Sequence, residues 1–250
     1  MKFNTNDYLA ALDNQIFGKK ILYIPKTQST NDDIWKHFND NDHLIVVTDY
    51  QTAGRGQRGN KWISKKFKSL IFSIGIIDDG KNSKLISLKS AISVARAIHK
   101  ITNLNPRIKW PNDILINNKK VAGILTESKI NRNKRILNIG IGINVNDESN
   151  DIDNLDQPVT SLMLEGNNIF SREIILGEFI KYMDSILYKN NQFIIDCWNE
   201  LCAHKNSLLT FHDCNHEIIK GKFIGIDNDG RAIVDTNGEI NYYLNGNLEL

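Results

Sequence analysis

Residues 51–62 read Q-T-A-G-R-G-Q-R-G-N-K-W, and this stretch decides the fold together with the residues that follow it. Three glycines within six positions let the backbone bend sharply and approach a ligand closely. The arginines between them place positive charge at the bend. Six basic residues and no acidic residue occur between positions 55 and 68, although the whole chain carries a net charge of only +2. The sequence therefore predicts a local anion-binding loop, which we favour over a solvated loop with incidental charge.

The three glycines also have the G-x-G-x-x-G spacing of a dinucleotide-binding turn, after a strand-like run at residues 44–48 and with Asp78 downstream. That motif requires a helix to begin at its third glycine. Residues 69–74 instead read S-L-I-F-S-I, which is rich in β-branched and aromatic residues and predicts a strand. We therefore reject a dinucleotide-binding fold. We also reject a P-loop, because Asn60 occupies the position at which that motif needs lysine.

The composition is that of an ordinary globular protein. The 250 residues are 41% apolar and 24% charged, which suits one main domain with at most a small appendage. Lys+Arg 31 against Asp+Glu 29 gives no overall field that would draw the chain to nucleic acid or membranes. The first residues lack an apolar signal segment, and no apolar run is long enough to span a bilayer. We expect a cytoplasmic protein without nucleic-acid or membrane partners.

The cysteines predict neither a disulfide framework nor a strong metal site. Three cysteines, with no C-x-x-C pair, suit a reducing compartment. His212, Cys214 and His216 would share one face of a strand. Without a fourth ligand, these three residues favour a polar strand face over a metal site.

The pattern of apolar residues predicts strands and helices in a mixed order. The expected helices cover residues 7–17, 84–101 and 171–188, and the expected strands cover residues 21–24, 44–48, 69–77, 107–109, 114–116, 120–127 and 136–146. From about residue 203 the chain turns to short strands separated by Asn-Gly and Asp-Gly turns, at residues 208–211, 217–226, 231–235 and 239–244.

Two polar clusters each have a structural and a functional interpretation. Ser29, Thr30 and Asn31 precede an amphipathic segment, where they either cap a helix or bind a small polar ligand. Asn112 and Asp113 follow a proline that interrupts two short strands, which places them at a bend. That bend is either a plain turn or a site where Asp holds Mg²⁺ and Asn binds an amide or a ribose.

The strands after this bend predict a ligand lying over a sheet. Lys120 lies at the entrance of a strand and is followed by small residues, so that a ligand can approach the backbone there. Gly140 and Gly142 lie inside the next strand. Strand glycines weaken packing unless another backbone or a ligand comes close, and these two therefore indicate a ligand site.

Five ordered motifs together resemble those of the biotin protein ligases, and the resemblance covers essentially the whole chain. The motifs are S-T-N from Ser29, Q-x-A-G-R-G-x-R-G-x-x-W from Gln51, K-W-P-N-D from Lys109, K-x-A-G-I-L-x-E from Lys120 and G-x-G-I-N from Gly140. The resemblance implies a two-step reaction. The biotin carboxylate attacks the α-phosphate of Mg·ATP and releases pyrophosphate, and biotinyl-5′-AMP then acylates one lysine of a carrier. That carrier would be the biotin carboxyl carrier protein of acetyl-CoA carboxylase.

The resemblance also implies the roles of the motif residues. Lys120 and Arg55 would be catalytic, because positive charge must be fixed where two anions meet. The residues expected to bind biotin are Ser29, Thr30, Asn31, Gln51, Gly54, Arg55, Gly56, Gln57, Lys120, Gly123, Gly140 and Gly142. The residues expected to bind ATP are Arg55, Arg58, Trp62, Lys109, Asn112, Asp113, Lys120 and Asn144, with Trp62 over the adenine and Asp113 as a ligand of Mg²⁺. The glycine-rich loop would close over the adenylate and exclude water.

The implied fold is α+β. We expect a mixed β-sheet backed by helices, like that of class II synthetases and biotin/lipoate ligases, in a catalytic domain of residues 1–202 that binds biotin and ATP. A small SH3-like β-barrel at residues 203–250 would follow it. A homodimer is an expectation from the resemblance alone.

The sequence departs from the family pattern in two places. Gln57 and Asn60 stand where many relatives carry arginine, so we expect a loop that retains the adenylate less tightly. The S-T-N motif begins at position 29, which leaves no room before it for the winged helix-turn-helix of some relatives. We therefore expect a ligase without DNA-binding function.

Two other functions are weighed against biotin ligation. A lipoate–protein ligase would share the fold and the adenylation chemistry, but the dithiolane of lipoate lacks hydrogen-bond donors. The polar cluster at Ser29, Thr30, Asn31 and Gln51 therefore favours the ureido ring of biotin. A non-catalytic biotin-sensing protein is the second alternative, and the presence of Lys120, Asp113 and both loop arginines argues against it.

Overall fold

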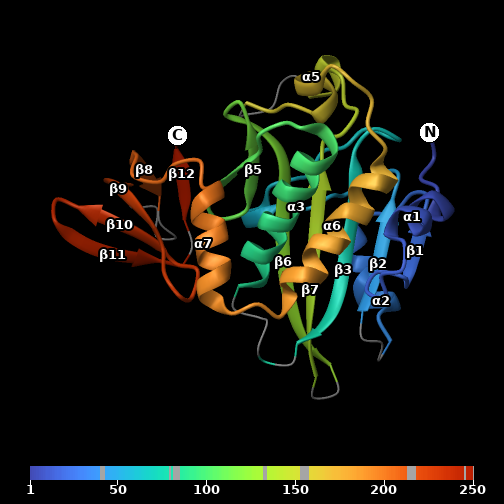
Figure 1. Ribbon diagram of the computed structural model, residues 1–250, viewed down its shortest axis with the longest axis horizontal. Coiled ribbons are helices and arrows are strands. Elements are labelled where there is room, and N and C mark those ends of the chain that lie inside the picture. Colours follow the sequence, from blue (N-terminus) through green and yellow to red (C-terminus); the bar gives the residue numbers. More distant parts are fainter. Residues whose placement is uncertain are drawn as a thin grey trace.

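The structure, a computed structural model, describes residues 1–39, 43–78, 80, 85–131, 134–152, 158–212, 218–244 and 246–249. Its strands form two separate sheets, and the smaller one lies at the end of the molecule opposite the N-terminus (Figure 1). Helices back the larger sheet, so the predicted α+β fold is confirmed. In the part of the chain that is described, no helix is both long and apolar enough to cross a membrane.

The larger sheet has seven strands in the order β1-β2-β3-β7-β6-β5-β4. β1 pairs with β2 in parallel and all other neighbours pair antiparallel, so the sheet is mixed as expected. Runs of Ile, Val, Leu and Phe form its centre because such side chains pack well on a pleated surface. The strands are β1 (Ile21–Ile24), β2 (His43–Thr48), β3 (Leu70–Asp78), β4 (Arg107–Lys109), β5 (Asp113–Ile116), β6 (Lys119–Asn131) and β7 (Lys134–Ile143).

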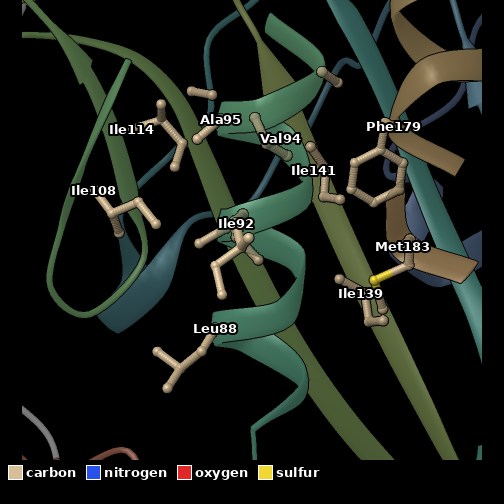
Figure 2. Packing of buried hydrophobic residues seen from close by; sticks show 14 of the residues in the cluster. Leu88, Ile92, Val94, Ala95, Ile108, Ile114, Ile139, Ile141, Phe179 and Met183 are labelled. Carbon is tan, nitrogen blue, oxygen red and sulfur yellow. The ribbon is translucent and has the colours of Figure 1, made fainter. Parts of the chain in front are cut away.

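One face of this sheet is covered by α3 (Ile86–Thr102) and α6 (Arg172–Leu187), and α1 (Thr5–Leu12) packs against α6 (Figure 1). Ile139 and Ile141 of β7 point to this side, where they join Phe179 and Met183 of α6 in the main apolar core (Figure 2). Successive side chains of a strand point to opposite faces. The residues between these isoleucines therefore face the other way.

The opposite face is only partly covered. Helix α2 (Thr30–His37) packs over β2, β3 and β7, and Ile34 and Phe38 form a second apolar cluster with residues of β2 and β7. Beside α2 the face carries Gly140 and Gly142, and the loop of residues 51–62 passes over it. This arrangement leaves room for a cavity on the sheet.

The smaller sheet is antiparallel, with the strand order β11-β10-β9-β8-β12. Its strands are β8 (Leu208–His212), β9 (Ile218–Ile226), β10 (Ala232–Thr236), β11 (Glu239–Tyr243) and β12 (Asn247–Glu249). The predicted module of short strands is confirmed, although within the described residues its hydrogen-bonded order runs from β11 to β12 without closing into a barrel. Helix α7 (Asn191–Leu201) precedes it, and the indole N–H of Trp110 donates to the carbonyl of Gly230 at 3.2 Å. The small sheet is thereby tied to the β4–β5 turn.

Some elements differ from the sequence-based expectations. Helix α1 begins and ends earlier than the predicted 7–17, because the Asn4 side chain accepts from the N–H groups of Asn6 and Asp7 and caps it. Helices α5 (Leu162–Gly166) and α7 were not predicted, nor were the short α4 (Ser149–Ile152) and strand β12. Lys84, Cys214 and His216, which entered the predictions, lie outside the described residues. The division of the chain after residue 202 remains a prediction.

Candidate functional site

A cavity of about 630 Å³ lies on the sheet face opposite α3 and α6. Its wall is built from the start of α2, the loop of residues 51–64, the β4–β5 turn, and strands β6 and β7. The structure brings seventeen of the eighteen predicted site residues into this wall, namely Ser29, Thr30, Asn31, Gln51, Arg55, Gly56, Gln57, Arg58, Trp62, Lys109, Asn112, Asp113, Lys120, Gly123, Gly140, Gly142 and Asn144. Gly54 does not line it.

Gly54 instead holds the loop in shape. A Cβ at this position would lie 2.5 Å from the carbonyl oxygen of Trp62 and 2.7 Å from Nε2 of Gln51. The Gly54 carbonyl also accepts from the backbone N–H of Trp62 at 3.0 Å. The absence of a side chain at Gly54 therefore lets the two ends of the loop close on each other.

The rest of the loop agrees with the rejection of a dinucleotide-binding turn. Residues Gln57–Gly59 form one 3₁₀ turn, in which Arg58 and Gly59 adopt left-handed backbone conformations with φ of 55° and 78°. No α-helix begins at Gly59, and the chain continues through irregular backbone into β3. The side chain of Arg58 is on the exposed surface of this turn.

One end of the cavity is a cluster of hydrogen-bonded polar side chains. The Gln51 side-chain oxygen accepts from the Thr30 N–H at 2.8 Å and from its hydroxyl at 3.1 Å. The Ser73 hydroxyl lies 2.7 Å from Thr30 Oγ1 and 2.6 Å from Asn31 Oδ1. Ser29 occupies the N-cap position of α2, but its side chain makes no capping hydrogen bond. The cluster is therefore held by its own cross-links rather than by helix capping.

Arg55 is paired with two carboxylates beside this cluster. Its guanidinium lies 2.6 Å from Asp32 and 3.2 Å from Glu127. The hydrogen bond to Asp32 is the main cause that raises the pKa of Arg55. Glu127 also accepts from the Asn31 side-chain amide at 3.0 Å. The positive charge expected to meet an anion is thus balanced by two acidic side chains in this structure.

Lys120 lines the cavity near the start of β6. Its ammonium is 2.7 Å from Asp113 Oδ1, with both side chains less than a fifth exposed. A Cβ at Gly123 would lie 3.4 Å from the same ammonium, so the lysine side chain extends along β6 toward Gly123. Asn112 holds the adjacent turn by donating to the Ile124 carbonyl at 2.7 Å.

The strand glycines are explained by two side chains of the protein itself. A Cβ at Gly140 would collide with the amide of Asn31, and a Cβ at Gly142 would collide with the indole of Trp62. The same indole would lie 3.2 Å from a Cβ at Gly123. Trp62 was expected over the adenine, but here its ring lies across the glycines expected to line the biotin site.

The other residues predicted to bind ATP lie at the β4–β5 turn and just after the end of β7. Asn144 follows β7 and donates to the Thr160 carbonyl at 3.0 Å, and Lys109 ends β4. Asp113, expected to bind Mg²⁺, is already paired with Lys120. Within the described ranges, no group of three or more His, Cys, Asp or Glu side chains is placed to hold a metal ion. Asp113 fits Mg²⁺ only as one carboxylate beside phosphate oxygens, which is how proteins commonly hold this ion.

Three buried polar atoms of the cavity wall have neither a hydrogen-bond partner nor an ion-pair partner among the described residues. They are Trp62 Nε1, Ser64 Oγ and Asp147 Oδ2. Buried polar groups are normally paired, because an unpaired one costs the desolvation free energy of that group. Ser64 and Asp147 were not predicted, and their unpaired state depends on tertiary packing that no local pattern reveals.

Comparison with known proteins agrees with this geometry. Residues 22–146 match the model of the "Biotin/lipoate A/B protein ligase family", and residues 210–246 match that of the "Biotin protein ligase C terminal domain". The chain belongs to the biotin/lipoate A/B protein ligase family. The two matched segments contain most of the larger sheet and most of the smaller one.

The relatives of this family member carry ligase names, some of which specify biotin. The chain is 29% identical over 260 residues to the Bifunctional ligase/repressor BirA of Bacillus subtilis, covering 100% of this chain and 79% of the relative. It is 31% identical to Biotin--protein ligase 1, chloroplastic, of Arabidopsis thaliana, covering 84% of this chain and 60% of the relative. The biotin protein ligase of Aquifex aeolicus, solved in complex with biotin and ATP, superposes with a TM-score of 0.79 at 26% identity. That superposition covers 92% of this chain and 99% of that one.

Proposed function

We propose that the protein is an ATP-dependent biotin–protein ligase, which activates biotin as biotinyl-5′-AMP and transfers the biotinyl group to a lysine of a carrier protein. The observation that carries the proposal is the position of the Lys120 ammonium, which lines the cavity beside Gly123, at a strand position between Ser73 and Ser69. Family membership and the biotin-ligase names of some relatives support the same reaction.

The register of the strands orders these features along the cavity. Ser73, beside the Thr30 and Asn31 cluster, pairs with Gly140, and Ile71 pairs with Gly142, which in turn pairs with Gly123 beside Lys120. Ser69 lies two residues farther on, at the end that holds Asn144 and Asp147. Four residues of extended strand span about 13 Å. A small polar ring at one end and a nucleoside at the other would therefore bring their reacting ends together near Lys120.

Lys120 suits the chemistry of the first step. A carboxylate oxygen attacks the α-phosphorus, and the bond to the bridging oxygen of pyrophosphate breaks. Both reactants are anionic, so a fixed cation between them lowers the repulsion and stabilises the charge that develops. Held rigidly at the end of β6, the ammonium would exchange Asp113 for the substrate oxygens.

Arg55 would act by changing partners. In the structure it is bound to Asp32 and Glu127, which places the loop close to the polar cluster. An adenylate under the loop would compete with these carboxylates for the guanidinium, since Arg forms strong bidentate bonds with phosphate and carboxylate groups. The loop would then exclude water from the reactive anhydride.

The polar end favours biotin over lipoate. Gln51, Thr30 and Asn31 present hydrogen-bonding groups at the end where the ring of the substrate would lie. A ureido ring has two N–H donors and a carbonyl acceptor, whereas a dithiolane has no comparable groups. The match of residues 210–246 to a C-terminal domain named for biotin ligases supports the same choice.

The finer features of this function are also part of the proposal. Mg²⁺ would be held by the phosphates together with Asp113, and would neutralise charge on the leaving pyrophosphate. The carrier would be the biotin carboxyl carrier protein of an acetyl-CoA carboxylase, and the reaction would take place in the cytoplasm. A homodimer is consistent with the family resemblance.

The proposal is tested by intact-mass measurement of a biotin carboxyl carrier domain incubated with the protein, Mg·ATP and either biotin or lipoate. We expect one biotinyl adduct and no lipoyl adduct. Lys120→Ala should slow biotin-dependent pyrophosphate release on the order of 10²- to 10³-fold, the usual loss when one fixed charge-stabilising group is removed.

Lys119→Ala is the matched control, because the Lys119 side chain is half exposed and pairs with Glu165 at 3.5 Å. It should retain the wild-type rate. A lipoyl adduct would support the lipoate alternative, and biotin binding without pyrophosphate release would support a biotin sensor.

A further inference from the structure

Asp147 is a buried acid at the end of the cavity away from the polar cluster. It is 2% exposed and lines the cavity together with Asn144 and Asp151. The Ser69 hydroxyl donates to its Oδ1 at 2.8 Å, which fixes the orientation of the carboxyl group. Its other oxygen, Oδ2, has no hydrogen-bond partner among the described residues.

A nearby cation, Lys68, is paired with other carboxylates rather than with Asp147. Its ammonium is held by Asp151 at 2.6 Å and by Glu148 at 3.0 Å. Burial is the largest influence on Asp147 and raises its pKa to about 6. An unpaired buried acceptor of this kind is costly, so the site gains from a ligand that supplies a donor.

The position of Asp147 selects the kind of donor. Phosphate and biotin carboxylate groups are anionic and would be repelled by this carboxylate, and the ring of biotin belongs at the opposite end, about 13 Å away along β3. Of the two substrates, only the nucleoside part of ATP is then left to lie beside Asp147. A nucleoside offers neutral donors of two kinds, the ribose hydroxyls and the amino group of adenine.

We propose that Asp147 is a specificity-determining residue of the nucleotide site, whose free Oδ2 accepts a hydrogen bond from a neutral O–H or N–H group of the nucleoside of ATP. This inference rests on the proposed function. Ser69 acts with it by donating to Oδ1, which fixes the carboxyl group in one orientation and leaves Oδ2 without a partner among the described residues. Nucleoside triphosphates without that donor would be selected against.

The test measures biotin-dependent pyrophosphate release with ATP, 2′-deoxyATP, 3′-deoxyATP and purine riboside triphosphate, which lacks the amino group. For the wild type, the analogue that lacks the bonded group should show a KM at least about tenfold above that of ATP, as expected for a hydrogen bond to a charged group. For Asp147→Ala, the KM for ATP should rise by a similar factor. In this variant, the analogue that lacks the bonded group should have a KM no higher than that of ATP. The KM for biotin should change little.

Glu148→Gln is the matched control, because it removes a charge from the adjacent, largely exposed side chain. It should retain the wild-type preference among nucleotides. Asp147→Asn, which keeps the size of the side chain, serves if the alanine variant does not fold, and it should lose part of the preference.

The outcomes separate the two proposals. If Asp147→Ala stops discriminating only between ATP and one deoxynucleotide, the hydrogen bond is assigned to the ribose hydroxyl missing from that nucleotide. If it stops discriminating only between ATP and purine riboside triphosphate, the bond is assigned to the amino group of adenine. A folded Asp147 variant with wild-type KM values for all four nucleotides overturns the inference and leaves the ligase function intact. A wild-type protein without biotin-dependent pyrophosphate release overturns the proposed function itself.

Discussion

Alternate residues of β7 serve two different surfaces. Ile139 and Ile141 face α3 and α6 (Figure 2), where they are buried in the main apolar core. Gly140 and Gly142 instead face the cavity under Asn31 and Trp62. The first surface is packed mainly with apolar side chains of the core. The second surface carries small residues, fixed charges and unpaired polar atoms. One strand therefore contributes folding free energy on one side and ligand recognition on the other.

Of the variants considered, Ile139→Ala should cause the largest loss in the free energy of unfolding, because Ile139 lies on the surface packed with apolar side chains. Removing three side-chain carbon atoms from a completely buried isoleucine typically costs about 3 kcal/mol, including the cavity that is left. Urea unfolding would measure this loss, and the KM values of the folded variant for biotin and ATP should stay close to wild type. Ile130→Ala, at an exposed position of β6, should cost less than about 0.5 kcal/mol. A raised KM for ATP in Ile139→Ala would show that the two surfaces are coupled.

His204 tests whether an unpaired polar group away from the cavity affects only stability. It is buried against Trp198 and Phe223, and both ring nitrogens lack partners among the described residues. Burial, followed by the charge of Lys109, lowers its pKa to about 3. The folded-state pKa lies below the unfolded value of 6.5, so protonation favours the unfolded chain. The stability that neutral His204 allows is present above about pH 6.5 and is lost as the pH falls below it.

Unfolding at a series of pH values would measure this dependence. Between pH 7 and pH 5, His204 should account for about 2 kcal/mol of lost stability. His204→Phe should remove that part of the pH dependence, whereas the same change at exposed His37 should not. An unaltered pH dependence in His204→Phe would contradict the assignment.

Gly142→Ala should have the smallest effect on stability and act mainly on the cavity surface. Its Cβ would occupy the place of the Trp62 indole, which belongs to a loop and can move. We expect at least a tenfold slower pyrophosphate release, equivalent to about 1.4 kcal/mol, with a smaller change in the free energy of unfolding. Gly123→Ala is the graded control, since its Cβ would lie 3.2 Å from the same indole and should slow the reaction less. Equal losses of stability and activity in Gly142→Ala would indicate that this glycine serves folding.

Much of the fold was predictable because its signals are local. The strand at residues 21–24 has the same bounds in the structure. The helix predicted at residues 171–188 is α6, which Ser171 caps by accepting from the Ile174 N–H. Helix α7 was missed although Asn190 caps it and Ile194 and Trp198 have helical spacing. The capping residue and the helical spacing are local features, and they would have predicted this helix from the sequence.

The composition of the cavity wall was predictable, but its internal contacts were not. Motif residues from five segments of the chain meet in one cavity, as the resemblance implied. The pairing of Arg55 with Asp32 and Glu127 joins residues 23 and 72 positions apart, and no local pattern encodes such a contact. The same is true of the unpaired oxygen of Asp147, because it depends on where Lys68 finds its partners.

The place of Trp62 gives the cavity an intrinsic optical reporter. Trp110 and Trp198 are enclosed in the core, and Trp35 lies beneath the ammonium of Lys129. The half-buried indole of Trp62 lies across Gly142 with its N–H unpaired, at the boundary between the loop and the sheet. Indole emission depends on the polarity around the ring. Any ligand that stacks on this ring or displaces it changes the fluorescence of the protein, so that occupancy can be followed without a label.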